Sequence, residues 1–309
     1  MNSESKNLSP FYVSYTMERV VQSVSLATII GIIFGFCLII GAIVHGTDNY
    51  LSFVSVEGFL IVIGGTIANA FMSYQATYVM KAFYSIGYMI KKPKATREGL
   101  NAEIMRLIKW AYLVHSKGLI GLEGEIGTKI KEPLLRYGLE LVITGYQPEV
   151  IRSMLNTAVE ADFERSITPV TILRNMASTA PAFGMVGTLV GMVIMLQHIQ
   201  ADMSNIGMGL AIALLATLYG ILTARLFYLP AADKLMQKEE IMRFRNYMMT
   251  EGLVLLAEKQ SPRYMQDKLN SFLDPKIHFN LDTQLKPPPS APAAPALVAT
   301  ADKAAAKAP

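Results

Sequence analysis

The chain has 309 residues, of which 52% are hydrophobic and 17% are charged, and its formal net charge is +4. Ordinary soluble domains carry about 25% charged residues, so this composition and a mean hydropathy of +0.34 indicate a polytopic membrane protein. The small net charge argues against nucleic-acid binding, and a single cysteine, Cys37, excludes a disulfide framework and a thiolate metal site.

The N-terminal part predicts two membrane helices behind a polar extension. Residues 1–22 lack the order of a signal peptide, in which a short basic region precedes an apolar core, so we expect a cytoplasmic extension. Residues 23–80 hold the first two predicted spans, about Leu26–Val44 and Phe59–Val79. The loop between them, Thr47–Glu57, has no Lys or Arg. Because positive residues stay on the cytoplasmic side, this turn is expected to face outward.

Residues 81–168 predict a large cytoplasmic helical domain, rich in Lys and Arg. Leu100, Ile104, Ile108 and Ala111 recur at helical spacing, and a helix that begins at Pro148 runs without a clear break into the third span. The charged stretch from His115 to Glu125 is either a solvated helix face or a contact surface for another protein.

Residues 169–230 hold the third and fourth predicted spans, Thr179–Leu196 and Gly207–Leu229, each close to the roughly 20 apolar residues that a bilayer requires. The break between them has no Lys or Arg and is expected to face outward. Residues 231–285 predict cytoplasmic C-terminal helices, and the Pro/Ala-rich residues 286–309 predict a disordered tail. The expected fold is all-α, with four transmembrane helices, a large cytoplasmic loop and cytoplasmic termini.

The last two spans carry small-residue faces that each include one threonine. One face contains Gly184, Gly187, Thr188 and Gly191, and the other contains Ala213, Thr217, Gly220 and Ala224. Small residues let membrane helices approach closely, and two hydroxyls at matched depth favour the wall of an ion path. The alternative is a packing role, in which each hydroxyl bonds the carbonyl four residues earlier in its own helix.

Two further features bear on the predicted ion path, namely prolines in the helices and the lack of acidic residues within the spans. Pro181 frees the carbonyl of Ala177 and is either a simple kink or a hinge that exposes an oxygen to a passing cation; Pro230 is a second hinge candidate. The spans have no Asp, Glu or His at depth, and Arg225 is the only charge in the last two. Ion paths through membranes normally need an ionisable group, so a partner helix must supply it. The sequence shows no nucleotide loop, catalytic triad or metal cluster, and we expect neither enzyme activity nor a cofactor.

Several motifs resemble the flagellar stator A-subunit family, MotA and PomA, within the wider MotA/TolQ/ExbB group, and in particular its sodium-type PomA branch. They are Ala180-Pro181-Ala-Phe-Gly184-Met-Val-Gly187-Thr188-Leu-Val-Gly191, Ala213-Leu-Leu-Ala-Thr217-Leu-Tyr219-Gly220, Phe227-Tyr-Leu-Pro230-Ala-Ala-Asp233-Lys234-Leu and Val62-Ile-Gly64-Gly65-Thr. The similarity covers roughly Leu26–Leu273.

The resemblance implies a motility subunit of the bacterial inner membrane. Five A subunits would surround two copies of a B subunit, MotB or PomB, which supplies the membrane aspartate. Ion passage would turn the A ring, and the cytoplasmic loop would push on the rotor protein FliG through His115, Lys117, Glu123 and Glu125. Two departures concern this loop and the inner ion exit: His115 replaces the family arginine, and Ser178 replaces an acid three residues before Pro181.

The resemblance also bears on the ion. Sodium-driven members resemble this chain in having Thr at the position of Thr188, and Thr217 would supply a second hard oxygen to a transient Na⁺. Ala216 is Thr in some sodium-driven members, which favours the alternative, a proton. Two other functions remain open, a TolQ/ExbB-type energiser of a periplasmic partner and a non-conducting membrane scaffold. Four predicted spans count against the energiser, whose relatives typically have three.

Overall fold

The computed structural model describes residues 24–87, 97–126, 130, 132–197, 203–273, 275, 278 and 280. Within these residues every regular element is a helix, which confirms the predicted all-α class. The predicted extension at residues 1–22 and the predicted tail at residues 286–309 lie outside the described residues.

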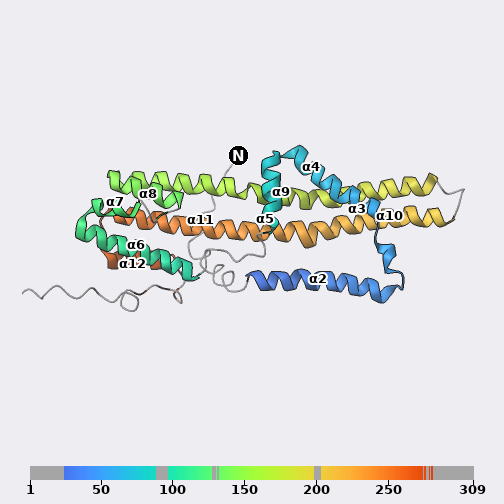
Figure 1. Ribbon diagram of the computed structural model, residues 1–309, viewed down its shortest axis with the longest axis horizontal. Helices are drawn as coiled ribbons and strands as arrows, with labels where there is room; N and C mark the ends of the chain where they lie inside the picture. The colour runs from blue at the N-terminus through green and yellow to red at the C-terminus, as the bar shows by residue number, and fades with distance from the viewer. Residues whose placement is uncertain are drawn as a thin grey trace, which may run out of the picture.

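The first half of the chain forms two apolar helices and a short helix that runs across them. The first span is α2 (Val24–Gly46), followed by the 3-10 turn η1 (Tyr50–Phe53). The second span is built from α3 (Val56–Phe59), the π-helical turn η2 (Leu60–Gly64) and α4 (Gly65–Ser73). A further helix, α5 (Ala76–Gly87), lies at right angles to the long axis of the molecule (Figure 1).

The second span ends earlier than predicted. We expected it to continue to Val79, but α4 ends at Ser73 and Tyr74 adopts extended backbone, with φ −136° and ψ 157°. The carbonyl oxygen of Gln75 then accepts the backbone N–H groups of Tyr78 and Val79 as α5 begins. The polar run from Ser73 to Gln75 therefore separates two helices that hydropathy alone merges.

Two long antiparallel helices form the axis of the molecule. One is α9 (Pro148–Gln197), and the other is continuous through α10 (Met203–Leu222), the π-helical segment η5 (Thr223–Tyr228) and α11 (Leu229–Ala257). The 50 residues of α9 span about 75 Å at 1.5 Å per residue. The predicted run of one helix from Pro148 into the third span is therefore confirmed.

The core of the domain that the sequence predicts to be cytoplasmic lies at the end of this pair remote from the spans (Figure 1). It is formed by α6 (Arg97–Lys117), η4 (Leu119–Leu122), α7 (Glu123–Ile126), α8 (Pro133–Thr144) and α12 (Pro262–Asn270), packed on the ends of α9 and α11. The predicted stripe on α6 is the centre of this core: Ile104 and Ile108 are completely buried. Periodicity predicted this packing because α6 has one solvated face.

Three stretches of the described chain are long and apolar enough to cross a membrane, namely Val56–Ser73, Pro148–Gln197 and Ile206–Ala257, and Ile33–Gly46 is a shorter apolar helix. Large apolar side chains such as Phe34, Leu189 and Leu214 are exposed on these helices. Exposed apolar surface of this extent is expected where helices face lipid or other subunits. The chain is thus a multi-pass membrane protein, and the number of four spans stays a prediction.

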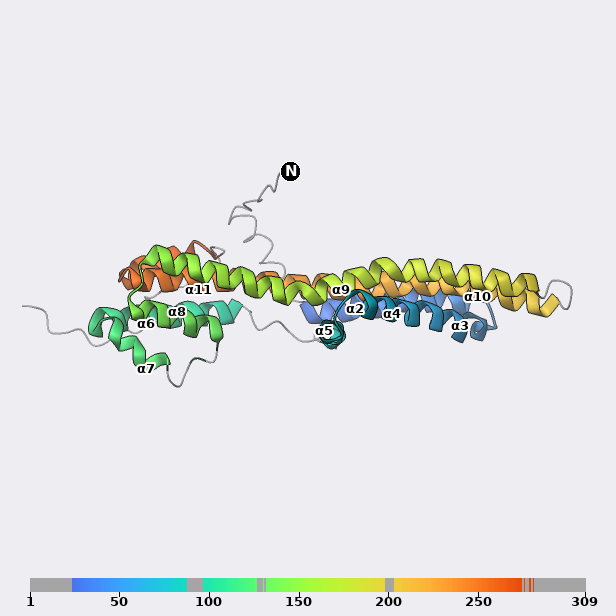
Figure 2. The same ribbon diagram turned by 90° about the horizontal axis from the view of Figure 1, so that it is seen from above.

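The second span packs on one side of the last two. Figure 2 shows α3 and α4 on this side of the α9–α10 hairpin, whereas Figure 1 shows α2 along the α10 edge, away from α4. Gly58 and Gly65 make this contact close, because a Cβ atom at Gly58 would lie 3.4 Å from the backbone nitrogen of Ala216 and one at Gly65 would overlap the ring of Phe183. The opposite side of the hairpin is not covered by the described elements of this chain.

Candidate functional site

The third and fourth spans pack backbone against backbone along a seam of small residues. A Cβ atom added to Gly191 would lie 2.6 Å from the backbone nitrogen of Ala213, and one added to Gly220 would lie 2.7 Å from the carbonyl oxygen of Ala180. Gly184 is buried in the same seam. The glycines that we expected on the wall of an ion path thus serve first to bring two helices of one chain together.

Thr188 and Thr217 lie beside this seam and are half-buried. The Oγ1 atom of Thr188 donates a hydrogen bond of 2.6 Å to the carbonyl oxygen of Met185, which is three residues earlier, whereas the packing alternative expected the carbonyl four residues earlier. A hydroxyl has one proton and two lone pairs. The lone pairs of Thr188 therefore stay available to an external ligand even though its proton is used within the helix.

The two threonines do not lie at the matched depth that we expected. A Cβ atom at Gly184 would meet Thr217, whose Cα lies 3.2 Å away, so these two residues are level with each other. Thr188 lies four residues beyond Gly184 toward the outer end of α9. The antiparallel register therefore separates the threonines by about one helical turn, roughly 5 Å.

Both threonines and Pro181 nevertheless share the uncovered side of the hairpin. Residues in an α-helix are about 100° apart, so Pro181 and Thr188 point in similar directions while Phe183, which packs on span two, points the other way. On α10, Tyr219 reaches span two, and Thr217, two residues earlier, faces away from it. We define Pro181, Thr188 and Thr217 as the free flank of the hairpin, and Figure 2 shows no described element on that side.

Tyr219 is a structural residue to which the sequence analysis assigned no role. Its hydroxyl accepts a hydrogen bond of 2.9 Å from the backbone N–H of Ser55 and donates one of 2.6 Å to the carbonyl oxygen of Phe53. Ser55 in turn caps α3 by accepting from the N–H of Gly58. The hydroxyl of a tyrosine in an apolar helix usually finds a hydrogen-bond partner. The presence of Tyr219 in the fourth span was therefore the one sequence signal that could have predicted this anchoring contact.

Ionisable groups are scarce at depth, as the sequence predicted. In the described parts of the third and fourth spans, from Thr179 to Gln197 and from Met203 to Leu229, there is no carboxylate, and the one charged residue, Arg225, lies exposed in η5. A cation path along the free flank therefore still requires a carboxylate from another chain.

The two hinge candidates lie in continuous helix. Pro181 is enclosed by α9 and half-buried, and its Cα lies 3.2 Å from where a Cβ at Gly220 would be. Pro230 follows the π-helical segment η5 directly. A proline cannot donate to, and clashes with, the carbonyl four residues earlier, and the wider π-turn accommodates it without ending the helix.

The predicted rotor-contact residues lie at the end of the molecule remote from the hairpin tip (Figure 1). His115 and Lys117 are exposed at the end of α6, and exposed Glu123 begins α7. Gly118 makes the turn between them with φ +71°, a conformation that favours glycine. The His115 ring nitrogen Nε2 lies 3.2 Å from the carbonyl oxygen of Gln260. Glu125 lies in α7, and its side chain is outside the described set.

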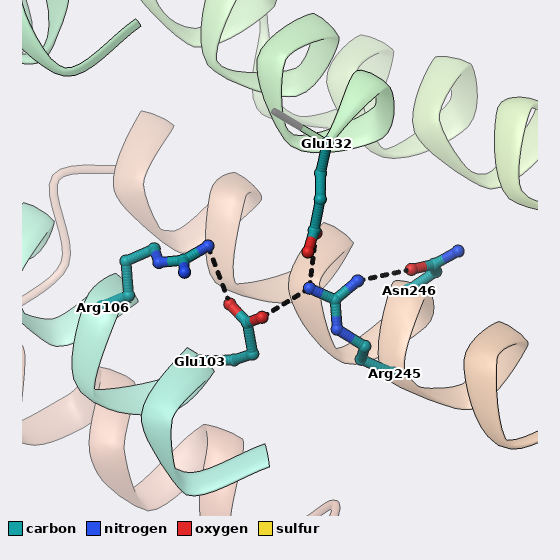
Figure 3. Close-up of polar contacts among 5 residues, drawn as sticks. All are labelled: Glu103, Arg106, Glu132, Arg245 and Asn246. Atoms are coloured by element: carbon teal, nitrogen blue, oxygen red, sulfur yellow. Dashed lines mark hydrogen bonds and ion pairs between the residues drawn. The ribbon is translucent and has the colours of Figure 1, made fainter. Parts of the chain in front are cut away.

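A buried arginine holds this distal domain to α11 (Figure 3). Arg245 is 7% exposed and donates to Glu103 of α6 at 2.6 Å, to Glu132 before α8 at 2.5 Å and to Asn246 at 3.2 Å. Arg106 adds an ion pair of 3.1 Å to Glu103. Burial alone lowers the pKa of Arg245, but the hydrogen bonds to the two glutamates outweigh it and raise the pKa above its usual value.

Three ion pairs join α9 to α11 at separate places along their length. They link Arg152 to Glu251, Glu160 to Arg243 and Arg174 to Asp233. The Glu160–Arg243 pair is bidentate, with bonds of 2.9 and 2.8 Å, and the guanidinium stacks on Phe163 with its central carbon 4.5 Å from the ring centroid. Planar two-bond pairing fixes geometry better than a point contact, so this pair holds α9 and α11 in register. We call the paired helices the stalk.

Comparison with known proteins assigns the family. Residues 127–248 match the MotA/TolQ/ExbB proton channel family. Chemotaxis protein PomA of Vibrio alginolyticus is 30% identical over 249 residues, which cover 81% of this chain and 95% of that protein. The uncharacterized protein YtxD of Bacillus subtilis is 32% identical over 248 residues, covering 79% and 89%. Motility protein A of Borreliella burgdorferi is 29% identical over 261 residues, covering 84% and 98%.

Solved structures agree with these relatives. The flagellar MotAB stator complex from Bacillus subtilis superposes with a TM-score of 0.70 at 26% identity, covering 82% of this chain and 97% of that chain. The C. jejuni MotAB structure gives a TM-score of 0.72 at 24% identity and shows the same fold over 81% and 96% of the two chains. With identity of 30% across four-fifths of its length and this shared fold, the chain belongs to the stator A-subunit branch, MotA and PomA, of the MotA/TolQ/ExbB proton channel family.

Proposed function

We propose that this chain is the ion-conducting A subunit of a flagellar stator in the bacterial inner membrane. The observation that carries the proposal is the free flank of the hairpin, where a proline and two threonines share the side of α9 and α10 on which Figure 2 shows no further described element. A helix of a MotB- or PomB-type partner would lie against this flank and supply the missing carboxylate. The solved relatives are MotAB complexes, which supports a partner of this type.

The transported ion is sodium in this proposal, and a proton is the alternative. Thr188 keeps its oxygen lone pairs available because its proton is donated to Met185. Hydroxyl and carbonyl oxygens suit a small hard cation such as sodium, just as Ca²⁺ and Mg²⁺ are bound through oxygen ligands. Thr217, one turn further inward, would take over the ion as it moves toward the cytoplasm.

The test of the ion is swimming speed against external sodium, at fixed pH and membrane potential, in cells whose own stator genes are deleted. With the partner co-expressed, speed should saturate with sodium, and Thr188→Ala should raise the sodium concentration needed. Thr171→Ala is the matched control, because Thr171 makes the same own-helix bond on exposed α9 outside the spans. Speed that ignores sodium and collapses with a protonophore would establish a proton motor.

Torque would pass from five A subunits around two B subunits to the rotor protein FliG through His115, Lys117, Glu123 and Glu125. Their place at the end remote from the spans supports this part of the proposal, since His115, Lys117 and Glu123 are exposed there. We expect Glu123→Lys to impair swimming at unchanged membrane level and ion leak. Glu164→Lys makes the same charge change on the exposed face of α9 and should have little effect. Equal loss in both variants would contradict a specific contact.

A further inference from the structure

Helix α5 lies across the axis of the molecule just beyond the inner end of the second span. In Figure 1 it runs crosswise to α9, and in Figure 2 it is seen end-on, so it lies across the spans in both views. Its inner face is completely buried, because Val79 and Ala82 pack into a cluster with Leu173 and Met176 of α9.

The level of this contact places α5 at the membrane surface. The hydrocarbon layer is about 30 Å thick, or about 20 helical residues. Counted inward from Leu196, at the apolar outer end of α9, this distance ends close to Met176. Because α5 packs on α9 and shares a buried cluster with its residues from Val170 to Ala180, a stretch centred close to Met176, it lies in the headgroup region of the inner leaflet, on the proposed orientation.

The outer face of α5 has the side chains of an interfacial helix. Tyr84 is 69% exposed and Met80 is 44% exposed, and Lys81 is exposed between them on the same stripe. The Lys81 ammonium lies 5.5 Å from the centroid of the Tyr78 ring. Tyrosine and lysine on one face of an in-plane helix are typical of contact with phospholipid headgroups.

The charge around α5 selects the class of lipid. The sequence contains no Asp or Glu between Glu57 and Glu98, so the charge of Lys81 is not offset by a neighbouring acid along the chain. Lys91, Lys92 and Lys94 follow in the sequence; they lie outside the described residues, and the site is defined without them. A basic interfacial helix with no acid attracts anionic headgroups over neutral ones.

We propose that the outer face of α5, formed by Met80, Lys81 and Tyr84, binds an anionic phospholipid of the inner leaflet. The apolar parts of Met80 and Tyr84 enter the boundary with the acyl chains, and Lys81 donates to the lipid phosphate. This contact anchors the inner end of the second span at the membrane surface. It rests on the proposed membrane orientation and is independent of which ion is conducted.

Quenching by brominated lipid tests where α5 lies. The complete stator complex with Tyr84→Trp is placed in vesicles of 70% phosphatidylcholine, brominated near the headgroup end of the acyl chain, and 30% phosphatidylglycerol. The native Trp110 is 3% exposed in the cytoplasmic core, so the difference from the parent complex reports the introduced indole. We expect strong quenching, and none for Tyr112→Trp on exposed α6. No quenching at Tyr84 would mean that water or another subunit covers this face, and would overturn the proposal.

Lipid retention tests the charge selection. The purified complex is equilibrated with equal amounts of phosphatidylglycerol and phosphatidylcholine, and the retained lipids are counted by native mass spectrometry. Lys81→Gln should lower the retained ratio of phosphatidylglycerol to phosphatidylcholine about fivefold, the effect of one lysine near an anionic surface, and Lys109→Gln on exposed α6 should leave it unchanged. An unchanged ratio in Lys81→Gln would overturn the anionic selection. Neither measurement uses ion flow or motility, so the proposed function is tested separately.

Discussion

At the residue scale, the glycines of the hairpin seam are the positions with least tolerance. A Cβ atom at Gly191 would lie 2.6 Å from the Ala213 nitrogen and 2.7 Å from the Gly209 carbonyl oxygen. Both are backbone atoms, which cannot rotate out of the way. We expect Gly191→Ala to destabilise the complex by about 1–3 kcal/mol, the usual cost of overpacking, and to lower the thermal midpoint of the detergent-purified protein.

The control for this prediction is another glycine of a membrane helix. A Cβ atom at Gly64 would meet nothing within 4 Å, so Gly64→Ala should be neutral or slightly stabilising, because alanine favours helix by about 0.5–1 kcal/mol. Equal loss of stability in both variants would show that the seam is more open than its backbone distances imply.

Tyr219 supplies a second prediction for a single residue. Tyr219→Phe removes the acceptor of the Ser55 N–H and the donor to the Phe53 carbonyl. Leaving such groups without partners costs about 1–3 kcal/mol, so the thermal midpoint should fall and the start of the second span should become accessible to protease. Tyr112→Phe, on the exposed side of α6, should behave as the parent in the same assay.

Helical spacing predicted that the small residues of the last two spans share one face of each helix. The scarcity of charge in these spans is visible in the sequence itself. Helical spacing did not predict the partner of each small face, because a glycine stripe looks the same whether it meets its own hairpin or another subunit. The depth of Thr188 relative to Thr217 likewise depends on the antiparallel register, which the seam contacts determine. Tertiary contacts thus decided what the local pattern left open.

At the element scale, length and continuity were the most predictable features. The stripe of α6 and the run of α9 through Pro181 followed from helical spacing, because long amphipathic or apolar segments have few alternatives. The break after Ser73 was missed, since apolar residues continue on both sides of it and only the extended backbone of Tyr74 separates α4 from α5. The direction of α5 depends on its packing against α9, which no local signal contains.

The Arg245 cluster yields a prediction about how elements are joined. Arg245→Ala leaves Glu103, whose side chain is 13% exposed, without its main counter-charge. Removing one partner of a buried pair costs about 3–5 kcal/mol, so the cytoplasmic domain should unfold at lower temperature. In contrast, Arg136→Ala breaks an exposed pair with Glu140 within α8, and the expected cost is about 0.3–0.5 kcal/mol.

Apolar replacement would distinguish charge pairing from packing at this cluster. A variant that combines Arg245→Met, Glu103→Met and Glu132→Gln removes the charges together, and it should recover most of the stability that Arg245→Ala loses. A combined variant as unstable as Arg245→Ala would show that the arginine acts through packing alone. Both measurements are thermal unfolding followed by circular dichroism on the same purified complex.

At the scale of the whole molecule, the free flank and the rotor-contact residues lie at opposite ends of one helix pair. A rotation that begins in the spans reaches the distal end only if α9 and α11 move as one body. Each of the three ion pairs is partly or fully exposed and is therefore weak by itself. Because they lie at three different places along the helices, together they oppose sliding of one helix past the other. If the proposed function holds, the resistance of the stalk to sliding and bending determines how much torque reaches the rotor-contact residues.

The stalk can be weakened without touching either end. Glu160→Gln, Asp233→Asn and Glu251→Gln together remove the carboxylates of all three pairs between α9 and α11. The matched control, Glu140→Gln, Asp162→Asn and Asp267→Asn, removes three exposed carboxylates that bond to residues of their own helices, namely Arg136, Arg165 and Gln266. Stall torque in a bead assay should fall in the first variant and not in the second, while cation leak stays at the parent level in both. The two variants carry the same change in net charge. If the first variant produced the same stall torque as the control variant, packing of α9 on α11 would transmit the force without the ion pairs.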